Sequence, residues 1–456
     1  MPHRVFKTVA SDFRRIPNPI KRACFSAAIF TAGWGFADCF FAILLAEIGS
    51  GLALVGLLSS FYAFIALLLA IPVGELDGRA NQKHILALGK IIYIFAGIFY
   101  FLAGYFKSIP LLVIALLANG IGNPLVYVTY NSYIRQRSSK HNSSRVFGLY
   151  AALTNLSWCG AMVLTSFLVI HFGVPLLFLF IPLFAALSLL SDLKLPACHN
   201  KTVLQGISDV VHKDHVYKRV FKHIRKMSFE LIFTFILQFF WGVLDFVAFI
   251  YIPILALREN YSLSQVALIM AFMYVPYFFS FFFAEIADKK ERMNILAISF
   301  ITAALFIAAL FGLKHPHAIY FLCFSLAICL AIIRPTLSGI ITNLAPRGQR
   351  SEISGIQTFF TRSGAIVGSL LFGVFSQMFG LGHTFLGLAI ITSLVGSSIF
   401  WVKDYCKTKE LLGKLNEAKG FHNYHPEFAK VNSCAKCRGE EVIEESEPTS
   451  VPAELQ

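Results

Sequence analysis

Two copies of one five-residue pattern carry the side chains best placed to do chemistry. Residues 34–38 read Trp-Gly-Phe-Ala-Asp and residues 241–245 read Trp-Gly-Val-Leu-Asp, at an offset of 207 residues. Each copy lies in a long apolar run, where a carboxylate costs at least about 2.5–3.5 kcal/mol and normally faces a cavity and a partner. Asp38 and Asp245 could therefore exchange protons near neutral pH, recognise a cationic or hydroxylated substrate, or make a structural hydrogen bond to a neighbouring helix.

Twelve apolar runs are long enough to position these residues in helices that cross a bilayer. Of the 456 residues, 57% are hydrophobic and only 14% are charged, and the mean hydropathy is +0.68. A span needs roughly 20 mostly apolar residues, and its backbone must be hydrogen-bonded internally. The predicted fold class is therefore an all-α membrane protein with spans at 23–47, 52–76, 85–106, 109–134, 146–171, 174–193, 228–256, 263–287, 294–313, 317–344, 353–380 and 382–402.

The net charge of +14 is a topology signal and does not indicate a nucleic-acid partner. Segments on the same side as the N-terminus hold 33 of the 39 Lys and Arg residues. By the positive-inside rule, we expect both termini to be cytoplasmic, at the inner membrane if the protein is bacterial. Residues 1–22 lack a cleavage pattern and have apolar residues at helical spacing, so we expect an amphipathic segment on the inner leaflet.

The second half of the sequence repeats the first. The matched aspartates are followed by further matches at offsets of 210 and 211, among them Ile85 with Ile295 and Pro124 with Pro335. This order indicates a parallel duplication. It predicts two six-helix bundles related by a pseudo-twofold axis, residues 23–193 and 228–403, joined by a cytoplasmic loop at 194–227. The polar tail at 404–456 has the composition of a disordered segment.

The loops after the second and eighth spans carry a signature. Residues 284–292 read Ala-Glu-Ile-Ala-Asp-Lys-Lys-Glu-Arg, and residues 74–83 read Gly-Glu-Leu-Asp-Gly-Arg-Ala-Asn-Gln-Lys. Together with the twelve spans and the duplication, these motifs resemble those of the major facilitator superfamily. The resemblance implies two bundles that rock about a substrate site near the bilayer midplane, lined mainly by the first, fourth, seventh and tenth helices.

The same resemblance suggests an inner gate at the loop motifs. Its aspartates could accept hydrogen bonds at the N-terminal end of a facing helix when the cytoplasmic side is closed. The alternative is that these residues only set topology and cap helix ends. The gating candidates are Asp77, Arg79, Asp288, Lys289 and Arg292.

Further polar and aromatic residues within the spans are candidates for the cavity wall. Arg334 could bind an anionic substrate group or balance the charge of Asp245, and its counterpart in the first half is Asn123. Arg362 is a second cationic candidate or a residue that snorkels to the inner leaflet. Trp34 and Trp241 could stack on a substrate or pack in the core. Hydrogen bonding between helices is the alternative for the remaining candidates, which are Asn119, Asn131, Asn155, Gln238 and Gln357.

The tail contains a possible zinc ligand set. His422 and His425 precede Cys434 and Cys437, which are suitable ligand types at unusually short spacing, and unrelated side chains of a flexible tail are the alternative. The sequence has no phosphate loop or catalytic motif, so we expect neither an enzyme nor a cofactor.

The expected function is secondary transport of a small solute, driven by protons, in a lipid bilayer and with no oligomer required. Multidrug or metabolite efflux is an alternative, although the Gly-Pro pair of drug antiporters is absent because residues 159–161 read Cys-Gly-Ala. A membrane sensor or assembly protein on the same fold is the alternative from another class.

Overall fold

The structure is a computed structural model of the chain, and all its regular elements are helical. It describes residues 17–49, 51–137, 143–196, 203, 205, 227–280, 282–283, 291–312, 317–344 and 350–418. Within these residues, twelve α-helices and one short 3-10 helix, η1 (Leu310–Gly312), follow one another. The α-helices are α2 (Asn18–Ile48), α3 (Leu52–Asp77), α4 (Gln82–Phe106), α5 (Ile109–Arg137), α6 (Ser143–Leu177), α7 (Phe180–Asp192), α10 (Phe229–Arg258), α11 (Leu263–Phe278), α13 (Arg292–Ala309), α14 (Ala318–Leu344), α15 (Arg350–Phe379) and α16 (Leu381–Ala418).

Every predicted span overlaps one of these helices. Ten of them are long and apolar enough to cross a membrane, and α7 and α11 are shorter apolar helices. The start of the sixth predicted span is broken because Gly173 adopts a positive φ of 69° and Pro175 follows it. The eighth predicted span, 263–287, extends beyond α11 into residues that are only partly described.

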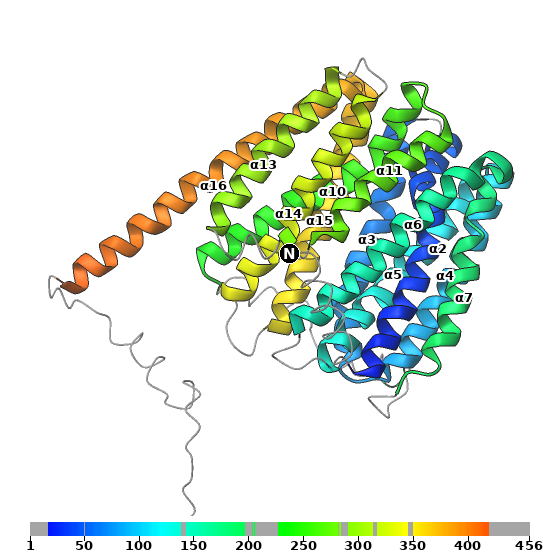
Figure 1. Cartoon of the computed structure of the whole chain (residues 1–456), viewed down its shortest axis with the longest axis horizontal. Helices are drawn as coiled ribbons and strands as arrows, with labels where there is room; N and C mark the ends of the chain where they lie inside the picture. The colour runs from blue at the N-terminus through cyan, green and yellow to red at the C-terminus, as the bar shows by residue number, and fades with distance from the viewer. Residues whose placement is uncertain are drawn as a thin grey trace, which may run out of the picture. The chain divides into compact units, whose positions relative to one another are not determined.

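Consecutive helices run in opposite directions, so the helix ends gather at two levels (Figure 1). We call the level at which α2 begins the Asn18 end and the level at which it finishes the Ile48 end. In the first half, α2 packs on α6 and α7, and α4 packs on α5 and α7. In the second half, α10 packs on α15, and α13 packs on α14. Figure 1 shows α2, α4, α5 and α7 grouped on one side and α13, α14 and α16 on the other.

Two pairs of helices make the most extensive contacts between the halves, and α2 adds smaller contacts with α10 and α11. The first is α3 with α15, and the second is α6 with α11. Under the offsets of the repeat, α3 corresponds to α11 and α15 to α6, so the two contacts are repeat equivalents of each other. One large core of buried apolar side chains extends through both halves.

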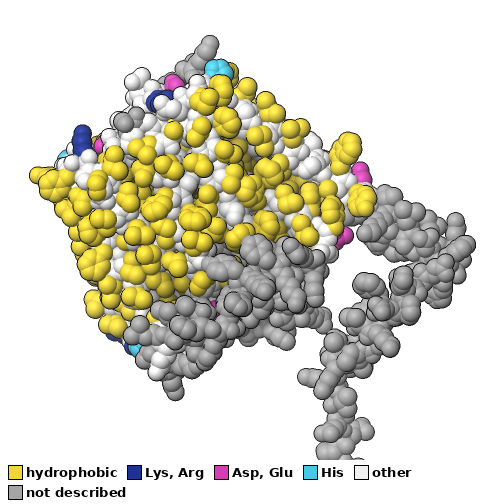
Figure 2. Space-filling model, turned by 180° about the vertical axis from the view of Figure 1, so that it is seen from behind, with side chains coloured by type: hydrophobic (Ala, Val, Ile, Leu, Met, Phe, Trp, Pro, Cys, Tyr) yellow, Lys and Arg dark blue, Asp and Glu magenta, His cyan; other side chains and the backbone are white. Residues whose placement is uncertain are grey.

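The outer surface is that of a membrane protein. Large apolar side chains are exposed on many helices, among them Phe95 at 54%, Leu164 at 56% and Leu305 at 65%. Figure 2 shows one such face, on which hydrophobic side chains cover the middle and the few charged side chains lie near its rim. A continuous apolar band of this kind suits contact with lipid hydrocarbon and is rare in water-soluble chains.

The predicted N-terminal segment, central loop and C-terminal tail lie partly or wholly outside the described residues. The last helix, α16, continues to Ala418, so the first residues of the polar tail at 404–456 are helical. Residues 1–16 of the amphipathic segment and 419–456 of the tail lie outside the described residues, as does most of the loop at 194–227.

Candidate functional site

A seam between α3 and α15 closes the space between the halves at the Ile48 end. A Cβ atom placed on Gly56 would lie 2.5 Å from the Ser369 carbonyl oxygen, and one on Gly373 would lie 2.7 Å from the Leu52 carbonyl oxygen. Only glycine permits such an approach of two helix backbones. The Leu52 amide donates to the side-chain oxygen of Gln377 at 2.9 Å, and this hydrogen bond links α15 to the start of α3.

From this seam toward the Asn18 end, α3 and α15 separate around a central cavity of about 510 Å³. Its wall includes residues 62–70 of α3 and residues 357–365 of α15, the stretches that follow the seam toward the Asn18 end. Residues of α2, α5, α6, α10, α11 and α14 complete the wall. Asn131 lines the cavity and is exposed, so the cavity reaches the surface near the Asn18 end of α5.

The two repeated aspartates are held by tyrosines of a single helix. Tyr274 donates to a carboxylate oxygen of Asp38 at 3.2 Å, and Tyr277 donates to Asp245 at 2.7 Å. Because the tyrosines are three residues apart on α11, they lie on one face of that helix. Asp245 and both tyrosines line the cavity, whereas Asp38 is linked to it through Tyr274.

The glycines of the repeated pattern have a packing role. A Cβ on Gly35 would lie 2.7 Å from the Trp158 carbonyl oxygen of α6, and one on Gly242 would lie 2.3 Å from the Thr361 carbonyl oxygen of α15. Each glycine thus lets the first helix of its half pack closely on the fifth. This contact places the aspartate of each pattern at a fixed depth beside the space between the halves.

The tryptophans of the pattern differ in their surroundings. Trp34 is 6% exposed and packs edge-on against Tyr93 and Tyr100 in the first half. Trp241 lines the cavity and donates its indole N–H to the Leu330 carbonyl at 3.4 Å. Of the two tryptophans, Trp241 is therefore the one that lies in the cavity wall.

Two arginines lie in the cavity wall. The guanidinium carbon of Arg334 lies 5.4 Å from the centre of a Trp241 ring, within the range of a cation–π interaction. Arg362 donates to the Asn123 side-chain oxygen at 3.0 Å and so links α15 to α5 across the halves. Asn123 in turn donates to the Tyr62 hydroxyl at 3.2 Å.

The amide candidates fall into two groups. Gln357 donates to Ser338 at 2.9 Å and Gln238 donates to Thr361 at 2.9 Å, which forms a polar strip on the wall from the second half. Asn155 also lines the cavity and donates to the Tyr277 carbonyl at 3.3 Å. Asn119 is 3% exposed, donates to Tyr100 and lies away from the cavity wall.

Three of the five gating candidates are described. Asp77 is fully buried and accepts a hydrogen bond from Thr129 of its own half at 2.8 Å. Arg79 pairs with Glu75 at 3.5 Å. Arg292 lies beside Gly339 of α14. The candidates Asp288 and Lys289 lie outside the described residues, as do the possible zinc ligands His422, His425, Cys434 and Cys437.

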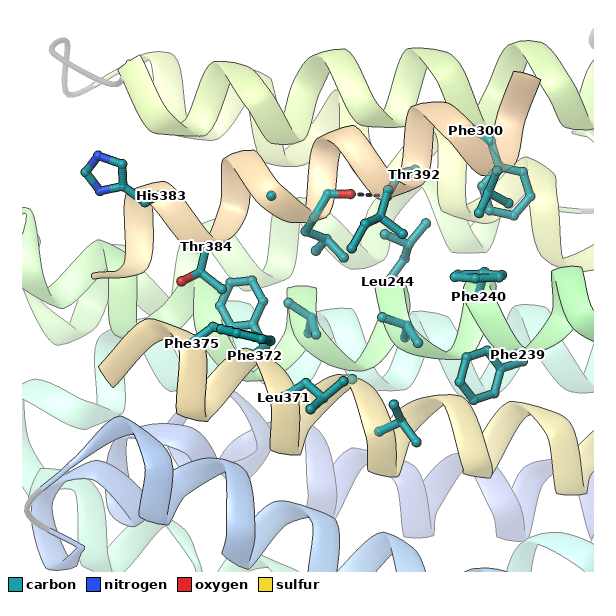
Figure 3. Close-up of a pocket in the computed structure, with 18 of the residues that line it drawn as sticks. Phe239, Phe240, Leu244, Phe300, Leu371, Phe372, Phe375, His383, Thr384 and Thr392 are labelled. Atoms are coloured by element: carbon teal, nitrogen blue, oxygen red, sulfur yellow. Dashed lines mark hydrogen bonds between the residues drawn. The ribbon is translucent and has the colours of Figure 1, made fainter. Parts of the chain in front are cut away.

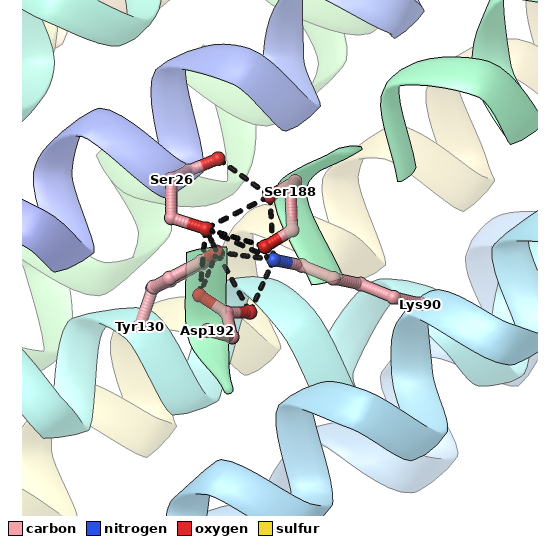
Figure 4. A network of polar contacts seen from close by, with 5 residues as sticks. All are labelled: Ser26, Lys90, Tyr130, Ser188 and Asp192. Carbon is pink, nitrogen blue, oxygen red and sulfur yellow. Dashed lines mark hydrogen bonds and ion pairs between the residues drawn. The ribbon is translucent and has the colours of Figure 1, made fainter. Parts of the chain in front are cut away.

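Sequence reasoning missed a second charged site, which lies inside the first half. Lys90 of α4 and Asp192 of α7 form an ion pair in which both residues are fully buried. Figure 4 shows Ser26, Tyr130 and Ser188 converging on this pair, and the Lys90 ammonium donates to Tyr130 at 2.6 Å. A lysine within a span signals that a partner exists, but Asp192 sits at the end of its run and no motif links the two.

The comparisons with known proteins agree with this architecture. The sequence matches the family described as Major Facilitator Superfamily over residues 23–369 and again over residues 268–419. The chain belongs to the major facilitator superfamily. A search of curated proteins found no match.

Two kinds of transporter are among the solved structures whose fold resembles that of this chain. A variant of the nucleoside transporter NupG superposes with a TM-score of 0.68 at 14% identity, covering 84% of this chain and 100% of that one. Another NupG structure gives 0.65 at 15% identity, with coverage of 84% and 98%. The human organic anion transporter MFSD10 gives 0.60 at 12% identity, with coverage of 84% and 100%. At these identities the likeness shows the fold.

Proposed function

We propose that the chain is a secondary active transporter that moves a small solute by alternating access and couples this movement to protons. The observation that carries the proposal is the central cavity between the halves, which contains Asp245, Arg334 and Arg362 and is sealed at the Ile48 end by α3 and α15. Burying charged side chains at this depth of the membrane costs free energy, and such residues are characteristic of a transport pathway.

The orientation follows from the distribution of Lys and Arg. The loops at the Asn18 end carry most of these residues, so this end faces the cytoplasm and the cavity is open to the inside. In the proposed cycle the two halves act as two six-helix bundles. Rocking them apart at the Ile48 end would separate Gly56 from Gly373 and expose the same cavity to the other side.

Proton coupling is assigned to Asp38 and Asp245. Both carboxylates lie in spans, and each accepts a hydrogen bond from a tyrosine of α11. A carboxylate at such a position can alternate between a charged form held by the tyrosine and a protonated form. Because the two tyrosines share one helix, movement of α11 would act on both carboxylates together.

The solute that fits the wall is a small polar molecule with an aromatic ring or an anionic group. Arg334 and Arg362 offer guanidinium donors to an anion, and Trp241 and Phe249 offer aromatic faces. NupG is a nucleoside transporter and MFSD10 an organic anion transporter, so both solute types are suitable first probes.

The test is uptake by proteoliposomes that contain the full-length protein, with a pH gradient and a panel of radiolabelled nucleosides and organic anions. We expect uphill uptake of at least one solute by the parent. We expect Asp38→Asn and Asp245→Asn each to abolish accumulation against a gradient, because neither amide can release a proton. Glu259→Gln, which replaces an exposed carboxylate outside the cavity wall by an amide in the same way, serves as a control that retains accumulation.

Two outcomes would count against the proposal. If both amide variants accumulate solute as the parent does, proton coupling through these aspartates is wrong. If no solute moves under any gradient while the purified protein still binds a solute in a thermal-shift assay, the protein is better explained as a membrane sensor on the same fold.

A further inference from the structure

The last helix of each half packs differently on its neighbours. In the first half, α7 makes extensive backbone contact with both α2 and α4. A Cβ on Gly33 of α2 would lie 2.7 Å from the Phe184 Cβ of α7, and one on Gly97 of α4 would lie 2.4 Å from Pro182. Among the described residues, α16, the counterpart of α7, makes few backbone contacts with α10 or α13. One of them is at Gly396, where a Cβ would lie 3.1 Å from the Ile301 nitrogen of α13.

The substitutions that separate α16 are visible in the repeat. The counterpart of Gly33 at the 207 offset is Phe240, and the counterpart of Lys90 at the 210 offset is Phe300. Thus the second half lacks both the small residue and the charged residue that bring the last helix close in the first half. Two phenyl rings take their places.

A pocket of about 590 Å³ occupies the resulting space between α10, α13, α15 and α16. Figure 3 shows Phe240 and Phe300 at one end and His383 at the other. Aromatic and aliphatic side chains form nearly all of the wall. The Thr384 hydroxyl donates to the carbonyl of Gly380, the residue before α16, at 2.8 Å, and the Thr392 hydroxyl donates to the Leu388 carbonyl within α16 at 2.7 Å. Neither hydroxyl therefore needs an acceptor from an occupant.

We propose that this pocket is a binding site for one acyl chain of a membrane phospholipid. The pocket borders the lipid-facing surface, where Leu371, Phe375 and Ile391 are about half exposed at 48, 46 and 50%. An occupant must be apolar because the wall offers almost no free polar group, and it must enter from a medium in which lipid is the abundant apolar molecule. His383 marks the Ile48 end, where the headgroup would lie.

Gly387 provides a direct way to fill the site. It lines the pocket, and a Cβ placed on it meets no atom within 4 Å. We expect full-length Gly387→Phe, purified in detergent and washed, to retain one phospholipid fewer per protein than the parent, as counted by mass spectrometry of extracted lipid. The matched control is Gly160→Phe on α6, an exposed glycine that also has open space at its Cβ, and it should retain as much lipid as the parent.

A second measurement uses the parent alone and does not depend on how the variant folds. The protein is loaded with phosphatidylcholine that carries a photoreactive acyl chain, washed as before and irradiated. Cross-links should concentrate in the peptides around 239–247 and 384–395. Cross-links spread evenly over all lipid-facing helices, equal lipid retention by Gly387→Phe, or release of a sterol in place of phospholipid would each overturn the assignment.

Discussion

The buried pair of Lys90 and Asp192 shows how one charged cluster can organise a bundle. Ser26 of α2, Lys90 of α4, Tyr130 of α5 and Asp192 of α7 meet at one point, with Ser26 donating to Asp192 at 2.6 Å. Four helices of the first half are therefore joined by groups whose hydrogen-bonding needs are met. Such a network favours movement of this half as a rigid unit.

Breaking this pair should be costly. Lys90→Met leaves Asp192 buried without its counter-charge, and we expect a loss of about 3–5 kcal/mol in stability, seen as a lower melting temperature of the purified protein. Asp192→Asn should lower it in the same way. The double variant Lys90→Met with Asp192→Leu should recover much of the loss, since no charge is then left unpaired.

The control for this experiment is Lys83→Met, on the same helix but at its partly exposed first turn. It should leave the melting temperature nearly unchanged. If Lys90→Met has the same melting temperature as Lys83→Met, the pair of Lys90 and Asp192 contributes little to stability and the cluster has another role.

At the scale of helices, the seam of α3 and α15 has no room for an added methyl group at Gly56 or Gly373. Ser60 and Ser369 share a hydrogen bond of 2.7 Å within it, and Tyr251 of α10 donates to the Ser369 carbonyl at 2.8 Å. These contacts lie directly beside the close approach of Gly56 and Gly373. The seam is therefore both tightly packed and hydrogen-bonded.

We expect Gly56→Leu to open the seam, because its side chain cannot fit against the Ser369 carbonyl. Spin labels at Ala53 and Met378, near the Ile48 ends of α3 and α15, should move apart by several ångströms in double electron–electron resonance. Gly160→Leu is the control, since that glycine faces open space. An unchanged distance in Gly56→Leu would mean that the seam does not hold the halves together at this end.

For the whole molecule, the orientation in the membrane can be tested at two exposed residues. Glu259 follows α10 at the Ile48 end, and His84 lies in the first turn of α4 at the Asn18 end. We expect a membrane-impermeant maleimide to label Glu259→Cys in intact cells, and to label His84→Cys only after permeabilisation. The parent measures the background from native cysteines, and the reverse pattern would invert the proposed topology.

The sequence by itself determined the helices, the duplication and the family. Spans depend on local length and apolarity, so they can be read without knowing which helices touch. The repeat identified Asp38 and Asp245 as equivalent residues because their neighbours match in order and spacing. The family assignment rested on the same patterns and is confirmed by the family match.

Only the tertiary structure decided what these residues meet. The tyrosines that hold both aspartates come from α11, and their counterparts in the first half at the 210 offset are Phe64 and Leu67, so the repeat predicts no such donors there. The pairing of Lys90 with Asp192 and the separation of α16 likewise depend on which helix faces pack together. Lipid chains solvate every apolar helix face equally well, so the hydrophobic effect does not choose between neighbours. Close packing and hydrogen bonds therefore determine which helices pair.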